Sequence, residues 1–180
     1  MTDLFQVRPI AAEEWRSYKR VRLQALQESP NAFSTTLADM LQRSDDGWAN
    51  RTAEAAASDN NYQLFAEVDG EPVGLAGGWI DSATPDLAHL FQVWVAPEYR
   101  CLGIGQKLVE MVIEWAKTKH VSNLELGVTL SDPPESSPAR RLYERLGFEI
   151  FGEPEPLRPG SELLIQAMRM RLEGMEKGDG

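Results

Sequence analysis

The sequence predicts a single α/β (α+β) domain whose elements follow the order β-α-α-β-β-β-α-β-α-β-β. Runs rich in β-branched and aromatic residues alternate with segments whose apolar residues recur at helical spacing. The chain has 180 residues, 42% of them hydrophobic, which is enough to bury a sizeable core. Neither an internal repeat nor a shift in composition divides it. We therefore place one domain over residues 1–172 and expect the polar, glycine-ended tail 173–180 to be disordered.

The first part of the chain predicts one strand and two helices. Residues 4–10 form the strand, and residues 13–28 carry apolar side chains at spacings of three and four that end before Ser29-Pro30. A second helix is predicted over residues 37–56, with Ser34 or Thr35 as its cap. The run Asp45-Asp46-Gly47 can interrupt that helix.

The remaining elements begin with a hairpin, because residues 62–68 and 72–80 flank Asp69-Gly70, a pair suited to positive φ. A buried strand over residues 87–95 follows, and then a long helix to about Lys119. The last predicted elements are a strand over 123–130, a Pro/Ser loop over 131–138, a helix that contains Tyr143 and ends at Gly147, a strand from Phe148, a connection over 153–156 and a strand over 161–171.

The strand that ends at Val95 passes into the long helix through a glycine loop, Arg100-Cys101-Leu102-Gly103-Ile104-Gly105. The start of a helix presents backbone N–H groups without intrahelical partners and the positive end of the helix dipole. Glycines let a phosphate approach those donors, and Arg100 adds positive charge. A lone Gly-x-Gly is weak evidence, because a turn also uses glycine for backbone freedom. The loop lacks the third glycine of the dinucleotide fingerprint and the Gly-Lys-Ser/Thr ending of a P-loop.

Two motifs together resemble the GCN5-related N-acetyltransferase (GNAT) superfamily. The run from Arg100 to Gly105, preceded by Val95-Ala96-Pro97, is similar to its acetyl-CoA-binding motif, and residues 139–148 are similar to its late helix, which ends in Leu-Tyr-x-x-x-Gly-Phe. The order of the elements also matches, so the resemblance covers nearly the whole chain. It implies a mixed, mostly antiparallel sheet flanked by helices, with acetyl-CoA as co-substrate.

The resemblance also implies which residues hold acetyl-CoA and act on it. Backbone groups of Val93, Trp94 and Val95 would pair with the pantetheine arm, and the pyrophosphate would lie beside Arg100. Tyr143 occupies the position that protonates the departing thiolate. The other cofactor-binding residues expected are Cys101, Leu102, Gly103, Ile104, Gly105, Ser136 and Arg140. Ser136 stands where the superfamily often has an asparagine; its hydroxyl either bonds the pantetheine or caps the following helix.

A general base is expected on the strand before the loop, because a protonated amine is not a nucleophile. His89 lies at the position, eleven residues before Arg100, where members of the superfamily place a glutamate or histidine. Imidazole titrates near neutral pH, which suits proton abstraction directly or through water. A lone histidine on an apolar strand is as often a packed residue. Members that act on protein N-termini often have a glutamate where this chain has Gly127, so resemblance to that subgroup is weaker.

The function expected is therefore acetyl transfer from acetyl-CoA to a primary amine of a small molecule or peptide. The alternative is a non-catalytic acyl-CoA-binding regulatory module. The resemblance also implies that a homodimer can form through the last strands. The Pro/Ser loop over 131–138 either reshapes the acceptor mouth or is a surface insertion.

Charge and cysteine content exclude several classes of partner. With 18 Lys and Arg against 28 Asp and Glu, the net charge is −10, which argues against nucleic acid. This acidity reflects either solubility or the attraction of amines. The single cysteine, Cys101, excludes an internal disulfide and a cysteine-based zinc cluster, and we expect no metal.

No signal peptide and no membrane-spanning run are apparent in the sequence, so we expect a cytoplasmic protein. Cys101 is not expected to act as a nucleophile, because the superfamily transfers the acetyl group directly. Phe33, Trp48 and Trp79 could line an acceptor pocket, but aromatic residues in such elements are usually buried, so we expect them in the core.

Overall fold

The computed structural model describes residues 4–172, apart from the side chain of Glu135. The predicted tail 173–180 lies outside the described residues.

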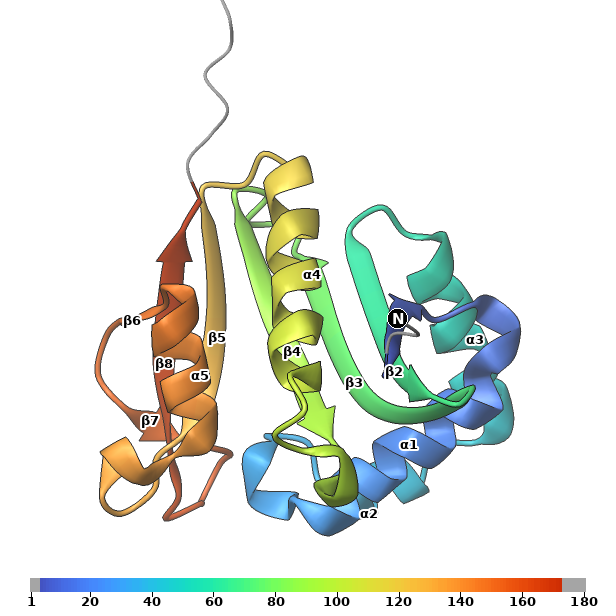
Figure 1. The fold of residues 1–180 in the computed structure, drawn as a ribbon, viewed down its shortest axis with the longest axis horizontal. Helices are drawn as coiled ribbons and strands as arrows, with labels where there is room; N and C mark the ends of the chain where they lie inside the picture. The colour runs from blue at the N-terminus through green and yellow to red at the C-terminus, as the bar shows by residue number, and fades with distance from the viewer. Residues whose placement is uncertain (1–3, 173–180) are drawn as a thin grey trace, which may run out of the picture.

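A twisted sheet crosses the molecule in the order β1-β2-β3-β4-β5-β8-β6, and β7 also pairs with β8 (Figure 1). Neighbouring strands are antiparallel except β4 and β5, which are parallel, so the predicted mixed and mostly antiparallel sheet is confirmed. The strands are β1 (Gln6–Pro9), β2 (Asn61–Val68), β3 (Glu71–Ile80), β4 (Leu87–Val95), β5 (Asn123–Thr129), β6 (Glu149–Ile150), β7 (Glu155–Pro156) and β8 (Leu164–Arg171).

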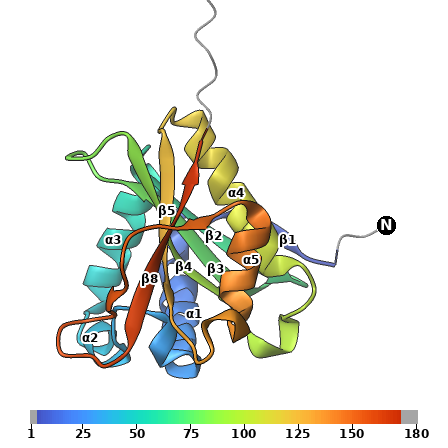
Figure 2. The same cartoon turned by 90° about the vertical axis from the view of Figure 1, so that its left-hand side faces the viewer.

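Helices cover both faces of this sheet, and each face has its own apolar core. Leu108, Val112 and Tyr143 belong to the core under α4 and α5, whereas Trp48 and Phe65 belong to the core under α1 and α3. Figure 2 shows α4 and α5 on one side of the sheet and α3 on the other. The helices are α1 (Trp15–Glu28), α2 (Leu37–Leu41), α3 (Asp45–Ala57), α4 (Ile104–Thr118) and α5 (Pro138–Leu146), with short 3-10 turns at Ala12–Glu14, Pro30–Ala32, Pro97–Tyr99 and Pro134–Ser136.

The predicted helix over 37–56 is two helices, and the predicted caps Ser34 and Thr35 are wrong. Thr36 caps α2 by accepting a hydrogen bond from the Asp39 amide at 3.1 Å. Ser44 caps α3 by accepting one from the Gly47 amide at 3.1 Å. A serine side chain that bonds the backbone two or three residues ahead begins a new helix, so the break precedes Asp45.

The predicted hairpin is confirmed, with φ of 51° at Asp69 and 82° at Gly70. The C-terminal strands differ from prediction. The strand expected from Phe148 is only the two-residue β6, the expected connection contains β7, and the last strand begins at Leu164 instead of Ser161. Both short strands pair with β8, whose other side pairs with β5 along seven residues.

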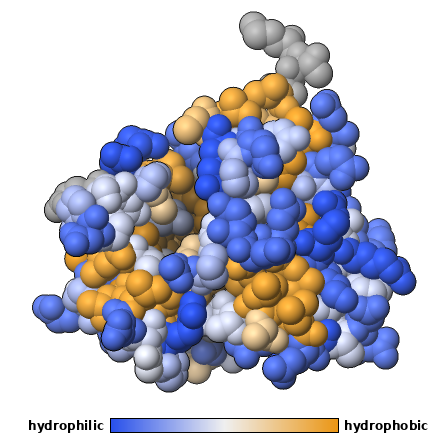
Figure 3. Space-filling model, turned by 90° about the horizontal axis from the view of Figure 1, so that it is seen from below, coloured by the Kyte–Doolittle hydropathy of each residue, from blue (hydrophilic) through white to orange (hydrophobic). Residues whose placement is uncertain are grey.

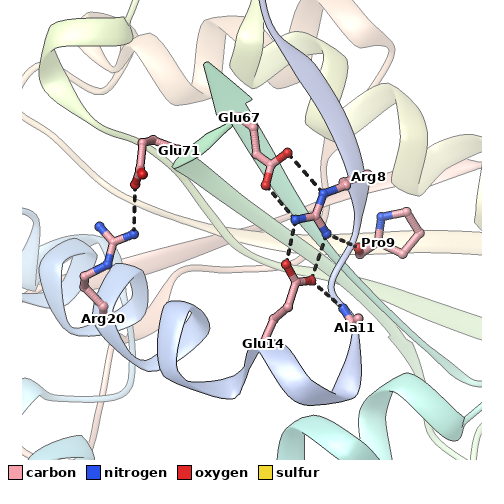
Figure 4. Close-up of polar contacts among 7 residues, drawn as sticks. All are labelled: Arg8, Pro9, Ala11, Glu14, Arg20, Glu67 and Glu71. Atoms are coloured by element: carbon pink, nitrogen blue, oxygen red, sulfur yellow. Dashed lines mark hydrogen bonds and ion pairs between the residues drawn. The ribbon is translucent and has the colours of Figure 1, made fainter. Parts of the chain in front are cut away.

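One arginine ties the first strand to the rest of the domain (Figure 4). Arg8 on β1 donates to Glu67 on β2, with Nη2 to Oε1 at 2.6 Å, and to Glu14 in the first 3-10 turn, with Nη2 to Oε1 also at 2.6 Å. Glu14 in turn accepts from the Ala11 amide at 2.8 Å. The hydrogen bonds to Glu14 and Glu67 raise the pKa of Arg8, and the Arg8 guanidinium lowers the pKa of Glu14. The short edge strand is thereby fixed to β2 and to the chain that leads into α1.

Arg8→Met is expected to lower the free energy of unfolding by about 1–3 kcal/mol, because it leaves two partly buried carboxylates without their common donor. Arg20→Met is the matched control, since Arg20 pairs with Glu71 at 3.5 Å and both side chains are more than half exposed. Such a pair contributes about 0–1 kcal/mol. Urea unfolding at neutral pH measures both variants, and equal midpoints would contradict the bridging role.

Candidate functional site

The parallel strands β4 and β5 pair over only three residues and then part. Their register runs from Leu87 opposite Asn123 to His89 opposite Glu125. In the described structure no β5 residue pairs with the rest of β4, although β3 still pairs with its other side. Backbone groups of β4 that face the gap are thus left for another partner. The carboxyl ends of both strands and the N-termini of α4 and α5 lie together at the lower end of Figure 1.

A bulge in β4 divides its residues between the two faces of the sheet. Gln92 has a φ of 49°, and the register with β3 shifts between Leu75 and Gly77. Gln92 faces α1, where its Oε1 accepts a hydrogen bond from Tyr18 at 2.8 Å. Val93 lies toward α5. The bulge therefore puts the adjacent residues Phe91 and Gln92 on the same side of the sheet, and alternation then places Val93 on the α5 side.

The space on the α5 side, here called the interstrand cleft, has a volume of about 480 Å³. Figure 3, seen from below Figure 1, shows a hollowed surface at this end of the molecule with hydrophobic side chains gathered beside it. The cleft is lined by residues from the end of α1, from β4, from the end of β5 and from α5, including Glu28, Asn31, Val93, Gly127, Thr129, Ser137 and Tyr143.

Tyr143 is the buried ionisable group of this cleft. Its ring is 7% exposed and meets Phe148 edge to face, with 5.9 Å between the ring centroids. Burial raises the pKa of Tyr143, so its hydroxyl, which is protonated at neutral pH, is a weaker acid than that of an exposed tyrosine. The hydroxyl can donate a hydrogen bond to a group that enters the cleft.

The glycine loop ends at the start of α4 as predicted. Gly103 caps the helix with a φ of 84°, and Cys101 has a φ of 63°. Among the described residues, the amides of Cys101 to Gln106 have no protein acceptor, and the first helical bond joins the Lys107 amide to the Gly103 carbonyl at 3.1 Å. A Cβ on Gly105 would lie 3.7 Å from Leu142 and 3.8 Å from Val95. Position 105 thus has room for a methyl group in the space between α4 and α5.

Arg100 is held at the start of the loop by protein groups. Its Nε donates to the Val95 carbonyl at 2.9 Å and its Nη2 donates to Glu28 at 2.8 Å. Glu28 also accepts from Trp94 Nε1 at 2.9 Å and from the Ser29 hydroxyl. Burial alone would raise the pKa of Glu28, but the hydrogen bonds from Ser29, Trp94 and Arg100 outweigh it and lower that pKa. The contact of Arg100 with a phosphate stays a prediction.

His89 lies at the last paired position of β4, where the strands begin to part. Its ring stacks on Trp79, with centroids 4.8 Å apart. Both line a second space of about 400 Å³, here called the histidine hollow, which also contains Phe91, Glu125 and Gly127. Glu125 is bound by Arg169, with Nε to Oε1 at 2.6 Å. The core assignments of Phe33 and Trp48 are confirmed, whereas that of Trp79 is wrong, because Trp79 is 37% exposed at this hollow.

The surroundings of Gly127 and Ser136 bear on two of the sequence-based expectations. A Cβ on Gly127 would lie 2.4 Å from Cδ1 of Ile165, so Ile165 fills the space of the glutamate found in some superfamily members. Ser137, and not Ser136, caps α5 by accepting from the Arg140 amide at 3.2 Å. Ser136 donates to the Pro133 carbonyl at 2.7 Å, so the capping alternative for Ser136 is wrong. The Arg140 side chain pairs with Glu144 at 2.8 Å.

Three arginines that the sequence analysis did not single out, Arg22, Arg43 and Arg51, line a third space beside Gln92. A signal for Arg22 exists in the sequence. It lies in the apolar stripe of α1 with Tyr18, Val21, Ala25 and Leu26, where an arginine is out of place. Arg43 and Arg51 carry no such signal, because their positions depend on how α3 packs.

Within residues 4–172 no helix is long and apolar enough to cross a membrane. The same residues hold no group of three or more His, Cys, Asp or Glu side chains close enough to bind a metal ion.

Residues 15–148 match the acetyltransferase (GNAT) family. An uncharacterized N-acetyltransferase of Methanocaldococcus jannaschii is 36% identical over 95 residues, which are 51% of this chain and 40% of that protein. A putative [ribosomal protein bS18]-alanine N-acetyltransferase of Bacillus subtilis is 32% identical over 91 residues, 51% of this chain and 56% of that protein. The matches thus span only part of these relatives.

Solved structures show the same fold. A GNAT-family acetyltransferase of Streptococcus pneumoniae superposes with a TM-score of 0.79 at 20% identity, over 94% of this chain and 99% of that chain. The putative acetyltransferase yncA of Salmonella typhimurium, solved with its cofactor acetyl-CoA, superposes with a TM-score of 0.74 at 18% identity, over 99% of both chains. Because the family match covers most of the described domain, the chain belongs to the acetyltransferase (GNAT) family.

Proposed function

We propose that the protein transfers the acetyl group of acetyl-CoA directly to a primary amine of a small molecule or peptide. The observation that carries the proposal is the parting of β4 and β5 beside a loop of unpartnered amides and a buried tyrosine. The family match and the acetyl-CoA named in the yncA structure support it.

The chain has groups suited to each part of acetyl-CoA. The amides from Cys101 to Gly105 face outward at the positive end of α4 and suit a pyrophosphate. The stretch of β4 from Val93 through Trp94 to Val95, which β5 does not pair, suits the amides of a pantetheine arm, as a neighbouring strand would; the Val95 carbonyl also accepts from Arg100. Arg100, Ser136 and Arg140 lie in the loops and helix that flank this path, and their contacts with the cofactor are part of the proposal.

Acetyl-CoA supplies an activated acyl group, and the chain must manage two protons. As the amine nitrogen bonds to the thioester carbon and the carbon–sulfur bond breaks, one proton leaves the nitrogen and one is needed at the sulfur. In our proposal His89 accepts the first, directly or through water, because it lies where the gap opens. Tyr143 donates the second, because it is a buried, protonated hydroxyl in the interstrand cleft.

Relatives differ in their acceptors. One matched protein is named for a ribosomal protein alanine and another, from Nocardia farcinica, for L-2,4-diaminobutyric acid. This chain has Gly127 where the subgroup that acts on protein N-termini often has a glutamate, and Ile165 fills the space beside it. The absence of this glutamate favours a small molecule over a protein N-terminus as the acceptor.

A non-catalytic acyl-CoA-binding module is the second candidate. The role of His89 keeps it open, because His89 stacks on Trp79 and so has a packing role without catalysis. Thiol release from acetyl-CoA, measured against a panel of amines, decides between them. We expect release with at least one amine; tight acetyl-CoA binding without turnover on any amine, peptide or aminoglycoside would favour the module.

Gly105→Glu is expected to abolish acetyl-CoA binding, since its side chain would enter the space between α4 and α5 and repel the phosphates. Thr118→Glu adds the same charge at the exposed far end of α4 and serves as control. Calorimetry measures affinity, and thermal unfolding verifies that both variants are folded. Wild-type affinity in a folded Gly105→Glu protein would refute the loop assignment.

His89→Ala is expected to lower turnover by roughly 10²- to 10⁴-fold, the range typical of losing a general base, while acetyl-CoA affinity is retained. His120→Asn replaces the chain's other histidine, after α4, with a residue that tolerates its φ of 56°. Rates across a pH range test the pair. Should His89→Ala keep the wild-type profile, His89 is a packing partner of Trp79.

Tyr143→Phe removes the hydroxyl but keeps the ring against Phe148. Turnover is expected to fall clearly with little change in acetyl-CoA affinity, the pattern of an interaction made mainly in the transition state. Tyr62→Phe is the control, because Tyr62 stacks on Trp115 away from the cleft. Wild-type turnover in Tyr143→Phe, on an acceptor for which chemistry limits the rate, would leave Tyr143 with packing alone.

A further inference from the structure

The third space, here called the arginine hollow, lies between α1, α3, β2 and the bulge of β4. Its volume is about 690 Å³. The ionisable side chains of lysine, arginine and acidic type that line it are Arg22, Arg43, Arg51 and Glu54. In a chain with a net charge of −10, three arginines against one glutamate form a local reversal of sign. Solubility does not require such a cluster, because like charges placed together repel.

The arginines of this hollow have no carboxylate partner among the described residues. Arg22 is only 8% exposed, and its guanidinium lies 4.6 Å from the centre of the Phe33 ring. Arg43 lies in the same way on Trp48, at 4.7 Å. Stacking satisfies the flat face of a guanidinium and leaves its N–H edge to other acceptors.

Burial lowers the pKa of both Arg22 and Arg43, and each has a neighbouring arginine that lowers it further. Arginine nevertheless stays charged in proteins, so the chain tolerates an unfavourable positive charge here. An anion in the hollow would remove that cost, because it would supply the missing counter-charge.

Buried polar atoms without a protein partner belong to residues that line the same space. Nη1 of Arg22 and Nε2 of Gln92 are donors of this kind, and Oδ1 of Asn61 and Oε1 of Gln63 are acceptors. The Tyr18 hydroxyl bonds Oε1 of Gln92 at 2.8 Å, which leaves the Gln92 amide nitrogen as the free end. A buried donor without a partner costs free energy, so the two donors, Arg22 Nη1 and Gln92 Nε2, favour an acceptor beside this hollow.

The arginine hollow adjoins the histidine hollow. Trp79 and Phe91 line both, and Gln92 of the arginine hollow is followed directly by Val93 of the interstrand cleft. A small molecule can therefore place one end among the arginines while its other end reaches the point where β4 and β5 part.

We propose that the acceptor is a small primary amine that also carries an anionic group, a carboxylate or a phosphate, and that Arg22, Arg43, Arg51 and Gln92 hold this group. The inference rests on the proposed acetyl transfer and specifies its acceptor class. The anionic end selects the substrate, and the amine is directed toward His89.

Matched pairs of amines test the charge requirement. L-serine is compared with L-serine amide for the carboxylate, and phosphoethanolamine with ethanolamine for the phosphate. In at least one pair, kcat/KM for acetylation is expected to be about 10- to 100-fold higher for the anionic member, as expected for charged hydrogen bonds. Which pair responds distinguishes carboxylate from phosphate.

Substitutions of the arginines test whether the preference for anionic amines arises in the arginine hollow. Arg51→Gln and Arg43→Gln are expected to lower kcat/KM for the anionic member about 10-fold or more, mainly through KM, and so to reduce the preference for the anionic over the neutral member. Arg22→Gln tests the buried member, with its fold checked by thermal unfolding. Arg20→Gln, which removes the same charge from α1 outside the hollow, is the control and should keep the wild-type preference.

A binding arm separates this inference from the acetyl-transfer proposal. Calorimetric titration of phosphoethanolamine and of L-serine into the protein with CoA measures the hollow without turnover. Arginine-dependent binding without acetylation would support the anion site and refute acetyl transfer to these amines. Acetylation with no preference for the anionic members, a preference unchanged by Arg43→Gln and Arg51→Gln, or neither binding nor acetylation of the anionic members would each overturn the inference.

Discussion

The early end of the β4–β5 pairing is the constraint on which the site depends. The two strands share three paired positions, and the sheet continues through β3 on one side and β8 on the other. A gap in the middle of a sheet exposes backbone groups that must find partners. Gly127, beyond the last paired position of β5, lines both the histidine hollow and the interstrand cleft. His89 lies in the first of these spaces and Tyr143 in the second.

The bulge at Gln92 determines which residues reach each side. It turns Gln92 toward Tyr18 and the arginines, and Val93 toward Tyr143. The proposed proton donor and proton acceptor thus line different spaces: Tyr143 lies in the cleft under α5, and His89 lies on the side of Trp79. This arrangement suits a direct transfer in which two reactants enter from opposite faces.

The chain is acidic as a whole, but the arginine hollow is positively charged. The net charge is −10, yet the space next to His89 is lined by three unpaired arginines, whereas Arg8, Arg100 and Arg169 elsewhere are neutralised by glutamates. Glu28 also links separate elements: it lies at the end of α1 and accepts hydrogen bonds from Trp94 on β4 and from Arg100 in the glycine loop. The helix that carries Arg22 is therefore connected by hydrogen bonds to the strand and loop of the interstrand cleft.

The sequence by itself determined the features that depend on neighbouring residues, such as turns and the ends of helices. The positive φ of Gly103 and Gly147, the hairpin at Asp69-Gly70 and the strand-to-helix loop all follow from residues next to one another in the chain. His89 and Tyr143 were singled out by the resemblance to the GNAT superfamily, through their positions in and before its two motifs. The break before Asp45 was misplaced, because a cap depends on which of several serines and threonines bonds the backbone.

Only the tertiary structure showed the residues of the arginine hollow, where we propose that the acceptor binds. Arg22 was visible as an arginine in an apolar stripe, but Arg43 and Arg51 join it only through the packing of α3 against α1, and Trp79 is exposed because it borders a hollow. The length of the β4–β5 pairing is likewise absent from the strand pattern, since alternation specifies which face a side chain takes and not where two strands separate. Contacts between residues far apart in the chain set these features, so no local pattern records them.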